Sequence, residues 1–129
     1  MTDGPERTPA TVPTAATPTI STHVLDAELG MPSEGVHVTL YRMGDDGAPI
    51  RMTQALTDGD GRVRDLLERP LAAGDYRLEF NLAGERRPGS GDDRFFRRLT
   101  VDLRIVDTNR SYHVPLLLAP FSMTTYRGS

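Results

Sequence analysis

The chain has 129 residues, no cysteine and no long run of apolar side chains. Without cysteine, disulfide bonds, thiolate zinc sites and cysteine nucleophiles are all excluded. No stretch approaches the roughly 20 apolar residues that a membrane-spanning helix needs, and the N-terminus lacks the apolar segment of a secretory signal. The sequence therefore predicts a cytoplasmic protein that does not contact a membrane.

A dominant charge is also missing. The chain carries 15 Lys and Arg against 18 Asp and Glu, which gives a net charge of -3. Its arginines are interleaved with acidic residues, and the arginine clusters at 85–87 and 94–98 are interpreted as solvated loop and strand faces. This balance gives no reason to expect a nucleic-acid partner.

The first 19 residues are mostly Thr, Pro and Ala, with few large apolar side chains. Prolines at positions 5, 9, 13 and 18 prevent a helix, and the segment shows no alternation typical of a strand. Such a segment cannot bury enough apolar surface to offset the entropy lost on ordering. We therefore predict a disordered leader over 1–19 and one folded domain over 20–129.

From Ile20 onward, short apolar-rich runs are separated by Gly, Pro and Asp. Strands are predicted over 20–26, 36–42, 49–56, 63–67, 75–82, 96–106 and 111–118, and 122–126 fits an eighth. Residues 83–94 contain Pro88 and three glycines, so this connection is predicted to hold at most one short helical turn. The pattern predicts an all-β fold, a two-sheet β-sandwich of seven or eight short antiparallel strands.

Three histidines are the first candidates for chemistry. His37 lies on the opposite face of its strand from the apolar residues and is interpreted as a surface or satisfied histidine. His113 opens an apolar run that contains Pro115. Because proline lacks a ladder donor, Pro115 predicts an edge or a disruption of the sheet, and an apolar strand of this kind is compatible with contact to another subunit.

Separate segments of the chain together resemble one protein family. They are STHVLD at 21–26, TDGDGRV at 57–63, HVPLLL at 113–118 and YRGS at 126–129. They resemble the 5-hydroxyisourate hydrolases, the enzyme branch of the transthyretin-like family, from about Ile20 to Ser129. The resemblance implies a transthyretin-like sandwich that hydrolyses 5-hydroxyisourate to 2-oxo-4-hydroxy-4-carboxy-5-ureidoimidazoline in urate degradation, without a metal or other cofactor.

The resemblance also implies a homotetramer with its sites in a channel where dimers meet. The residues that match the family's catalytic positions are His23, Arg62, His113 and Ser129, and those expected to bind substrate are His23, Arg62, Tyr126 and Ser129. Hydrolysis of a cyclic amide needs a base for water and donors for the developing oxyanion. His113 is the preferred base and His23 its partner, although their roles can be exchanged. Arg62 would face the carbonyl oxygens, and Ser129 would donate a hydrogen bond.

The residues before the terminal motif depart from the family. The segment FSMT at 121–124 stands where a glycine and more aromatic residues are usual, and these positions would lie near the channel mouth and alter access to it.

Several alternatives stay open at this stage. They are a non-catalytic carrier of small aromatic ligands, as the vertebrate transthyretins are, a plain interaction module, a zinc hydrolase built on the histidines, and a covalent mechanism through Ser129. The two histidines, Arg62 and the terminal motif favour the enzyme over the carrier.

Overall fold

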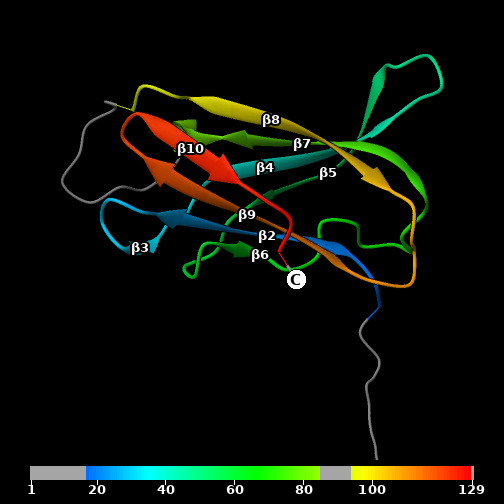
Figure 1. Ribbon diagram of the computed structural model, residues 1–129, viewed down its shortest axis with the longest axis horizontal. Helices are drawn as coiled ribbons and strands as arrows, with labels where there is room; N and C mark the ends of the chain where they lie inside the picture. Colours follow the sequence, from blue (N-terminus) through cyan, green and yellow to red (C-terminus); the bar gives the residue numbers. More distant parts are fainter. Residues whose placement is uncertain (1–16, 85–93, 129) are drawn as a thin grey trace, which may run out of the picture.

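Two β-sheets packed face to face make up the computed structural model, which describes residues 17–84 and 94–128 (Figure 1). One sheet has the order β10-β9-β2-β3, with β6 also paired to β2, and the other has the order β5-β4-β7-β8. The strands are β2 (Ile20–Asp26), β3 (Met31–Pro32), β4 (His37–Met43), β5 (Pro49–Leu56), β6 (Arg62–Val63), β7 (Gly74–Asn81), β8 (Arg98–Ile105), β9 (Tyr112–Ala119) and β10 (Ser122–Thr125). The predicted all-β sandwich is confirmed.

The hydrophobic core lies between the two sheets. From β7, Tyr76, Leu78 and Phe80 point into it and are 1%, 0% and 0% exposed, while Leu116 and Leu118 enter from β9. Burying a side chain of this size contributes roughly 1.5–3 kcal/mol relative to leaving it exposed. The alternation of apolar and polar residues thus determines which face of each strand is buried.

The same alternation determines what the sheet with β2 presents on its outer face. Along β2 the burial alternates from Ile20 to Asp26, with every second residue buried and the others half-buried. Because side chains on a strand point to opposite faces in turn, Ser21, His23 and Leu25 face away from the second sheet. The outer face of this sheet is where the candidate site lies.

One pairing differs from the predicted antiparallel arrangement. Strands β2 and β9 run parallel, in register from Ile20↔Tyr112 to Asp26↔Leu118. Parallel neighbours need a long crossover connection rather than a hairpin, and here the chain passes through the whole second sheet between the two strands. Local turn signals could not reveal this direction, because no turn connects the pair.

Two short strands also differ from the sequence prediction. The strand predicted over 63–67 is limited to Arg62–Val63, because the Asp65 carboxylate accepts hydrogen bonds from the backbone N–H groups of Leu67 and Glu68, both at 3.1 Å. Such side-chain bonds compete with a strand ladder. In addition, Met31–Pro32 pairs back onto the end of β2 and forms a two-residue strand that the sequence did not predict.

Pro115 lies in an interior strand, so the edge alternative was wrong and the disruption alternative is confirmed. Strand β9 is flanked by β10 and β2, but the pairing with β10 stops at Thr125↔Leu116. Tyr112 donates its N–H to Thr19 on the β2 side at 2.8 Å. Since successive N–H groups alternate sides, the Pro115 nitrogen faces the β10 side, where no ladder partner is needed.

In the described part of the connection after β7, residues Leu82–Gly84 form a 3-10 turn. The rest of that predicted loop, over 85–93, and residues 1–16 of the predicted leader lie outside the described residues. In the part of the chain that the structure describes, no helix has the length and apolar character needed to cross a membrane.

Candidate active site

Three of the predicted site residues meet on the outer face of the sheet that contains β2. His23 on β2 is directly opposite Arg62 on β6. His113 on β9 is opposite Ser21, two residues before His23 on the same face of β2. All of these side chains are half-buried. The fold therefore assembles His23, Arg62 and His113 from three strands that are far apart in the sequence.

The turn before β6 sets the position of Arg62. The Asp58 carboxylate accepts hydrogen bonds from the N–H groups of Arg62 at 3.0 Å and Asp60 at 2.9 Å, and the Asp58 N–H donates to the Arg62 carbonyl at 3.0 Å. The hydrogen bond from the Arg62 N–H is the largest cause that lowers the pKa of Asp58. The carboxylate thus stays ionised at neutral pH and holds the turn closed.

Gly61 allows this turn to pack against β2. Its φ is +76°, and a Cβ at this position would lie 2.3 Å from the carbonyl oxygen of Val24. The Val24 N–H also donates to the Gly61 carbonyl at 2.7 Å. Only glycine fits this conformation at this distance, and the close approach brings Arg62 beside His23.

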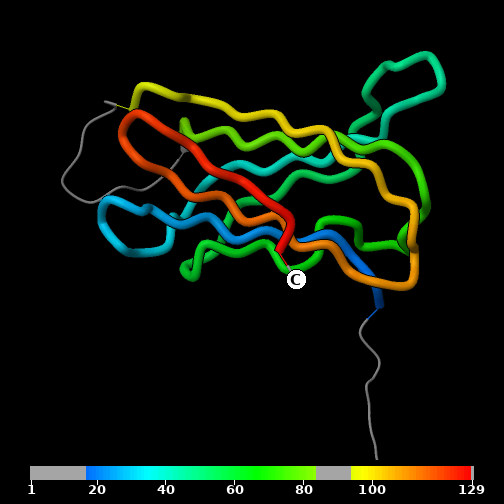
Figure 2. The backbone as a smooth tube through the Cα atoms, in the orientation of Figure 1, coloured from blue at the N-terminus to red at the C-terminus, as the bar shows by residue number. Residues whose placement is uncertain are grey.

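Contacts on two sides fix the His113 ring. The Ser21 Oγ lies 2.9 Å from Nδ1 of His113. On the other side, the Gly128 N–H donates to the His113 carbonyl at 2.7 Å, and a Cβ on Gly128 would stand only 3.0 Å from Cδ2 of the ring. Figure 2 shows the C-terminal segment continuing from β10 toward β9, where Gly128 pairs antiparallel with His113.

The charge around His113 favours its neutral form. Burial is the main cause that lowers the pKa of His113, and the positive charges of Arg62 and His23 lower it further. A neutral imidazole at neutral pH can accept a proton, as a general base must. In the described residues its hydrogen-bond partner is the Ser21 hydroxyl rather than a carboxylate.

The three histidines do not form one group. His37 lies on β4 of the second sheet, while His23 and His113 share the first sheet. Among residues 17–84 and 94–128, no group of three or more His, Cys, Asp or Glu side chains could hold a metal ion. The zinc alternative therefore finds no set of ligands in this part of the chain.

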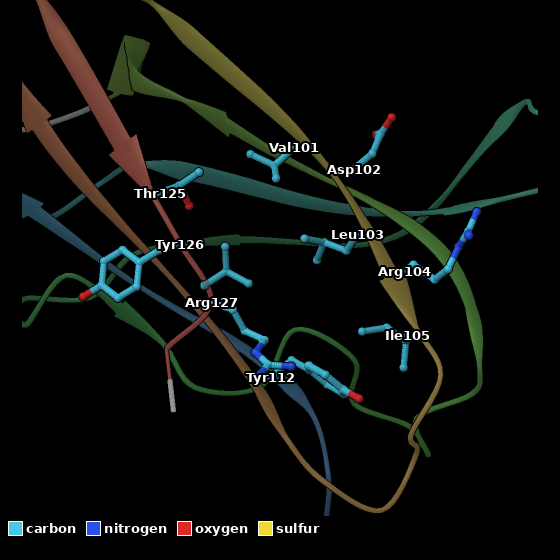
Figure 3. Close-up of a pocket in the computed structure, with 10 residues that line it drawn as sticks. Val101, Asp102, Leu103, Arg104, Ile105, Tyr112, Thr125, Tyr126 and Arg127 are labelled. Carbon is cyan, nitrogen blue, oxygen red and sulfur yellow. The ribbon is translucent and has the colours of Figure 1, made fainter.

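The remaining predicted residues lie elsewhere. Ser129 falls outside the described residues. Tyr126 is 54% exposed and, with Arg127, lines a cavity of about 340 Å³ at the open edge between β8 and the β9–β10 pair. Figure 3 shows the Tyr126 ring turned away from Leu103 and Ile105. This cavity is separate from the histidines and lacks their acid–base groups, so we place the candidate site on the outer face. Substrate binding by Tyr126 stays a prediction.

The sequence interpretation missed three contributors to the site, namely Ser21, Asp58 and Gly128. Each stood in a quoted motif without a role of its own. The spacing of Ser21 and His23, two apart on a predicted strand, was a signal that both face the same side. The partner of Ser21 could not be inferred, because it depends on the parallel pairing of β2 with β9.

Known proteins resemble this chain over most of its length. The 5-hydroxyisourate hydrolase of Salmonella typhi is 39% identical over 122 residues, which cover 94% of this chain and 88% of the relative. The solved structure of Klebsiella pneumoniae 5-hydroxyisourate hydrolase has a TM-score of 0.71 and 35% identity, and covers 88% of this chain and 100% of that one. Sea bream transthyretin in complex with thyroxine has a TM-score of 0.75 and 29% identity, over 84% of this chain and 93% of its own.

A family model agrees with these relatives. The model described as HIUase/Transthyretin family matches residues 20–128, which is nearly the whole predicted domain and includes His23, Arg62 and His113. The resemblance that the sequence motifs suggested is confirmed, and with it the transthyretin-like fold. The chain belongs to the HIUase/Transthyretin family.

Proposed function

We propose that this chain is a 5-hydroxyisourate hydrolase, which opens the ring of 5-hydroxyisourate with water in urate degradation. The predicted hydrolase class is confirmed by curated relatives that carry this name. The observation that supports it in this chain is the group of His23, Arg62 and His113 on one face, with the pKa of His113 lowered so that the ring is neutral.

His113 is proposed to start the reaction as general base. Its free ring nitrogen takes a proton from water, and the water oxygen bonds to the carbonyl carbon of the cyclic amide. The carbon–nitrogen bond of the ring then breaks, the carbonyl carbon becomes a carboxyl group, and the leaving nitrogen takes up a proton from an imidazolium. Atoms and charge balance with water as the only co-substrate. A base of this kind contributes about 10²- to 10⁴-fold to the rate.

Arg62 and His23 are proposed to hold the substrate and stabilise the developing charge. Arg62 is fixed by its turn and makes no ion pair within the described residues. Its planar donors suit the carbonyl oxygens of a urate-like ring. His23, directly opposite Arg62, can orient the water or protonate the leaving nitrogen. Donors that are already in place cost no reorganisation when the oxyanion forms.

A homotetramer is part of this proposal. The site lies on an open outer face rather than in the described cavity, so a single chain exposes it to water. Leu25 and Leu117 lie half-buried on the same face, next to the histidines. A second copy laid against this face would turn it into a channel that excludes bulk water while admitting the substrate and the reacting water. Native mass spectrometry of the untagged protein should show a four-chain species, and a monomer under those conditions would contradict this part.

The function is tested by the ultraviolet decay of 5-hydroxyisourate that is freshly generated from urate by urate oxidase. With the untagged protein the decay should be much faster than the spontaneous rate. Decay at the spontaneous rate from a folded protein would reject the enzyme.

The polar residues of the site, rather than the fold, distinguish a hydrolase from a non-catalytic carrier. The sea bream transthyretin structure resembles this chain as closely in fold as the hydrolase structure does, so the sandwich alone does not separate the two functions. A site with two histidines and an arginine is suited to acid–base chemistry. This constellation favours hydrolysis over non-catalytic binding of a small aromatic ligand.

A further inference from the structure

The Ser21 hydroxyl forms a hydrogen bond with Nδ1 of His113, the proposed general base. Ser21 Oγ and His113 Nδ1 are 2.9 Å apart, and both side chains are half-buried on the outer face of the sheet. The proposed reaction does not use this contact. Because Nδ1 is engaged by the Ser21 hydroxyl, Nε2 is the ring nitrogen left to face the substrate.

Hydrogen bonds on both sides hold the pair in register. One residue further along each strand, the Thr22 hydroxyl donates to the Val114 carbonyl at 2.6 Å and is buried. On the other side, the N–H of Tyr112, one residue before His113, donates to the carbonyl of Thr19, two residues before Ser21, at 2.8 Å. The Ser21–His113 contact is thus set by the rigid parallel ladder rather than by two mobile side chains.

The surroundings favour one direction for this hydrogen bond. A neutral imidazole has one N–H donor and one acceptor nitrogen. If Ser21 donated to Nδ1, Nε2 would carry a hydrogen and add a further donor near the guanidinium of Arg62, whose positive charge helps to lower the pKa of His113. If Nδ1 donates to Ser21 instead, Nε2 keeps a lone pair, which a positive charge nearby favours. The second arrangement is electrostatically favourable.

We propose that Ser21 is a positioning residue that holds His113 in the Nδ1–H tautomer, so that Nε2 accepts the proton from water. The inference rests on the proposed hydrolysis for its catalytic consequence, whereas the tautomer itself is independent of it. Gly128 completes the arrangement, because its backbone packs against the Cδ2 edge of the ring, opposite the hydroxyl. Ser21 thereby has the orienting part that a carboxylate has in many His-dependent hydrolases.

The first test measures the ring nitrogens directly. In the ¹⁵N spectrum of histidine-labelled protein at about pH 8, where neutral histidine dominates, His113 should carry its hydrogen on Nδ1. Ser21→Ala should shift His113 toward the Nε2–H form or toward a mixture. An Nε2–H tautomer in the wild-type protein would overturn the proposal, whether or not the protein hydrolyses 5-hydroxyisourate.

The second test is kinetic and uses a matched serine. Ser21→Ala should lower kcat about tenfold, the size of one lost hydrogen bond, with little change in KM. Ser21→Thr, which keeps the hydroxyl, should retain most of the activity. Ser111→Ala is the control, because Ser111 Oγ accepts from the Thr19 N–H at the same strand junction and does not contact a histidine. Equal kcat values for the Ser21→Ala and Ser111→Ala variants would reject the positioning role.

Discussion

The two outer faces of the sandwich differ in how their positive side chains are paired. On one face, arginines form ion pairs with acidic residues on the neighbouring strand, whereas the positive side chain on the other face forms no ion pair among the described residues. On the face formed by β7 and β8, Arg77 and Asp102 are cross-strand partners and form an ion pair at 2.8 Å. Arg104 and Asp75 do the same at 3.0 Å. Opposite charges placed directly across a sheet stabilise the pairing of the strands.

The outer face of the other sheet gathers His23, Arg62 and His113, and none of the three forms an ion pair among the described residues. The result is visible in the lowered pKa of His113, to which Arg62 and His23 contribute after burial. The fold thus accepts unfavourable electrostatics at one face and compensates charge at the other. Under the proposed function, this difference separates a face for chemistry from a face for stability.

The largest expected effect compares a histidine from each face. His113→Ala should lower the rate of 5-hydroxyisourate hydrolysis by about 10²- to 10⁴-fold, because the base is removed. His37→Ala, on β4 of the ion-paired sheet, is the matched control and should keep the wild-type rate. The ultraviolet decay assay measures both. An equal loss of hydrolysis rate in the two variants would contradict the proposal that only the face with His113 takes part in the reaction.

An intermediate effect compares an arginine from each face. Arg62→Gln should lower kcat/KM by about 100-fold, because a fixed donor to the oxyanion is lost, whereas Arg77→Gln should leave it unchanged. The wild-type acid limb should lie below the ordinary histidine pKa of about 6.5. Because the positive charge of Arg62 disfavours imidazolium, its removal raises the pKa of His113 and moves the acid limb to higher pH.

A pH–rate profile of both arginine variants makes this measurement. The shift should be partial, since burial is the larger cause of the lowered pKa of His113 and remains in the Arg62→Gln variant. An acid limb that stays in place, or that moves to lower pH, would contradict the electrostatic role of Arg62.

The smallest expected effect concerns the backbone against His113. Gly128→Ala would place a Cβ 3.0 Å from Cδ2 of the ring, so that the ring or the chain end must shift, and activity should fall about tenfold, within the range known for misplaced catalytic groups. Gly59→Ala is the control, because nothing lies within 4 Å of a Cβ built there. Activity assays with circular dichroism would show the loss without unfolding, and equal activity in both variants would argue against the contact.

Much of the fold followed from local patterns. The bounds of β2 and β5 agree with the predicted ranges 20–26 and 49–56, because their apolar spacing and flanking turns are local signals. The strand expected over 63–67 failed, because the Asp65 side chain competes with the ladder through hydrogen bonds that a periodicity argument does not contain.

The residues of the candidate site came from a different kind of signal. Family motifs identified His23, Arg62 and His113, whereas residue spacing did not predict that the three share one face. Strand periodicity says that Ser21 and His23 share a face, yet it does not say which strand lies beside them. That information comes from the parallel register with β9 and from the pairing with β6.

By itself the sequence determined the all-β class, the buried face of the main strands and the set of polar residues available for chemistry. These are consequences of side-chain type and of the two-residue period of a strand, which act over a few neighbours. The tertiary structure alone decided that Ser21 meets His113, that Gly128 lies against the imidazole and that Arg62 stands opposite His23. Such contacts depend on register between distant segments, which is set by packing of the whole core rather than by any local pattern.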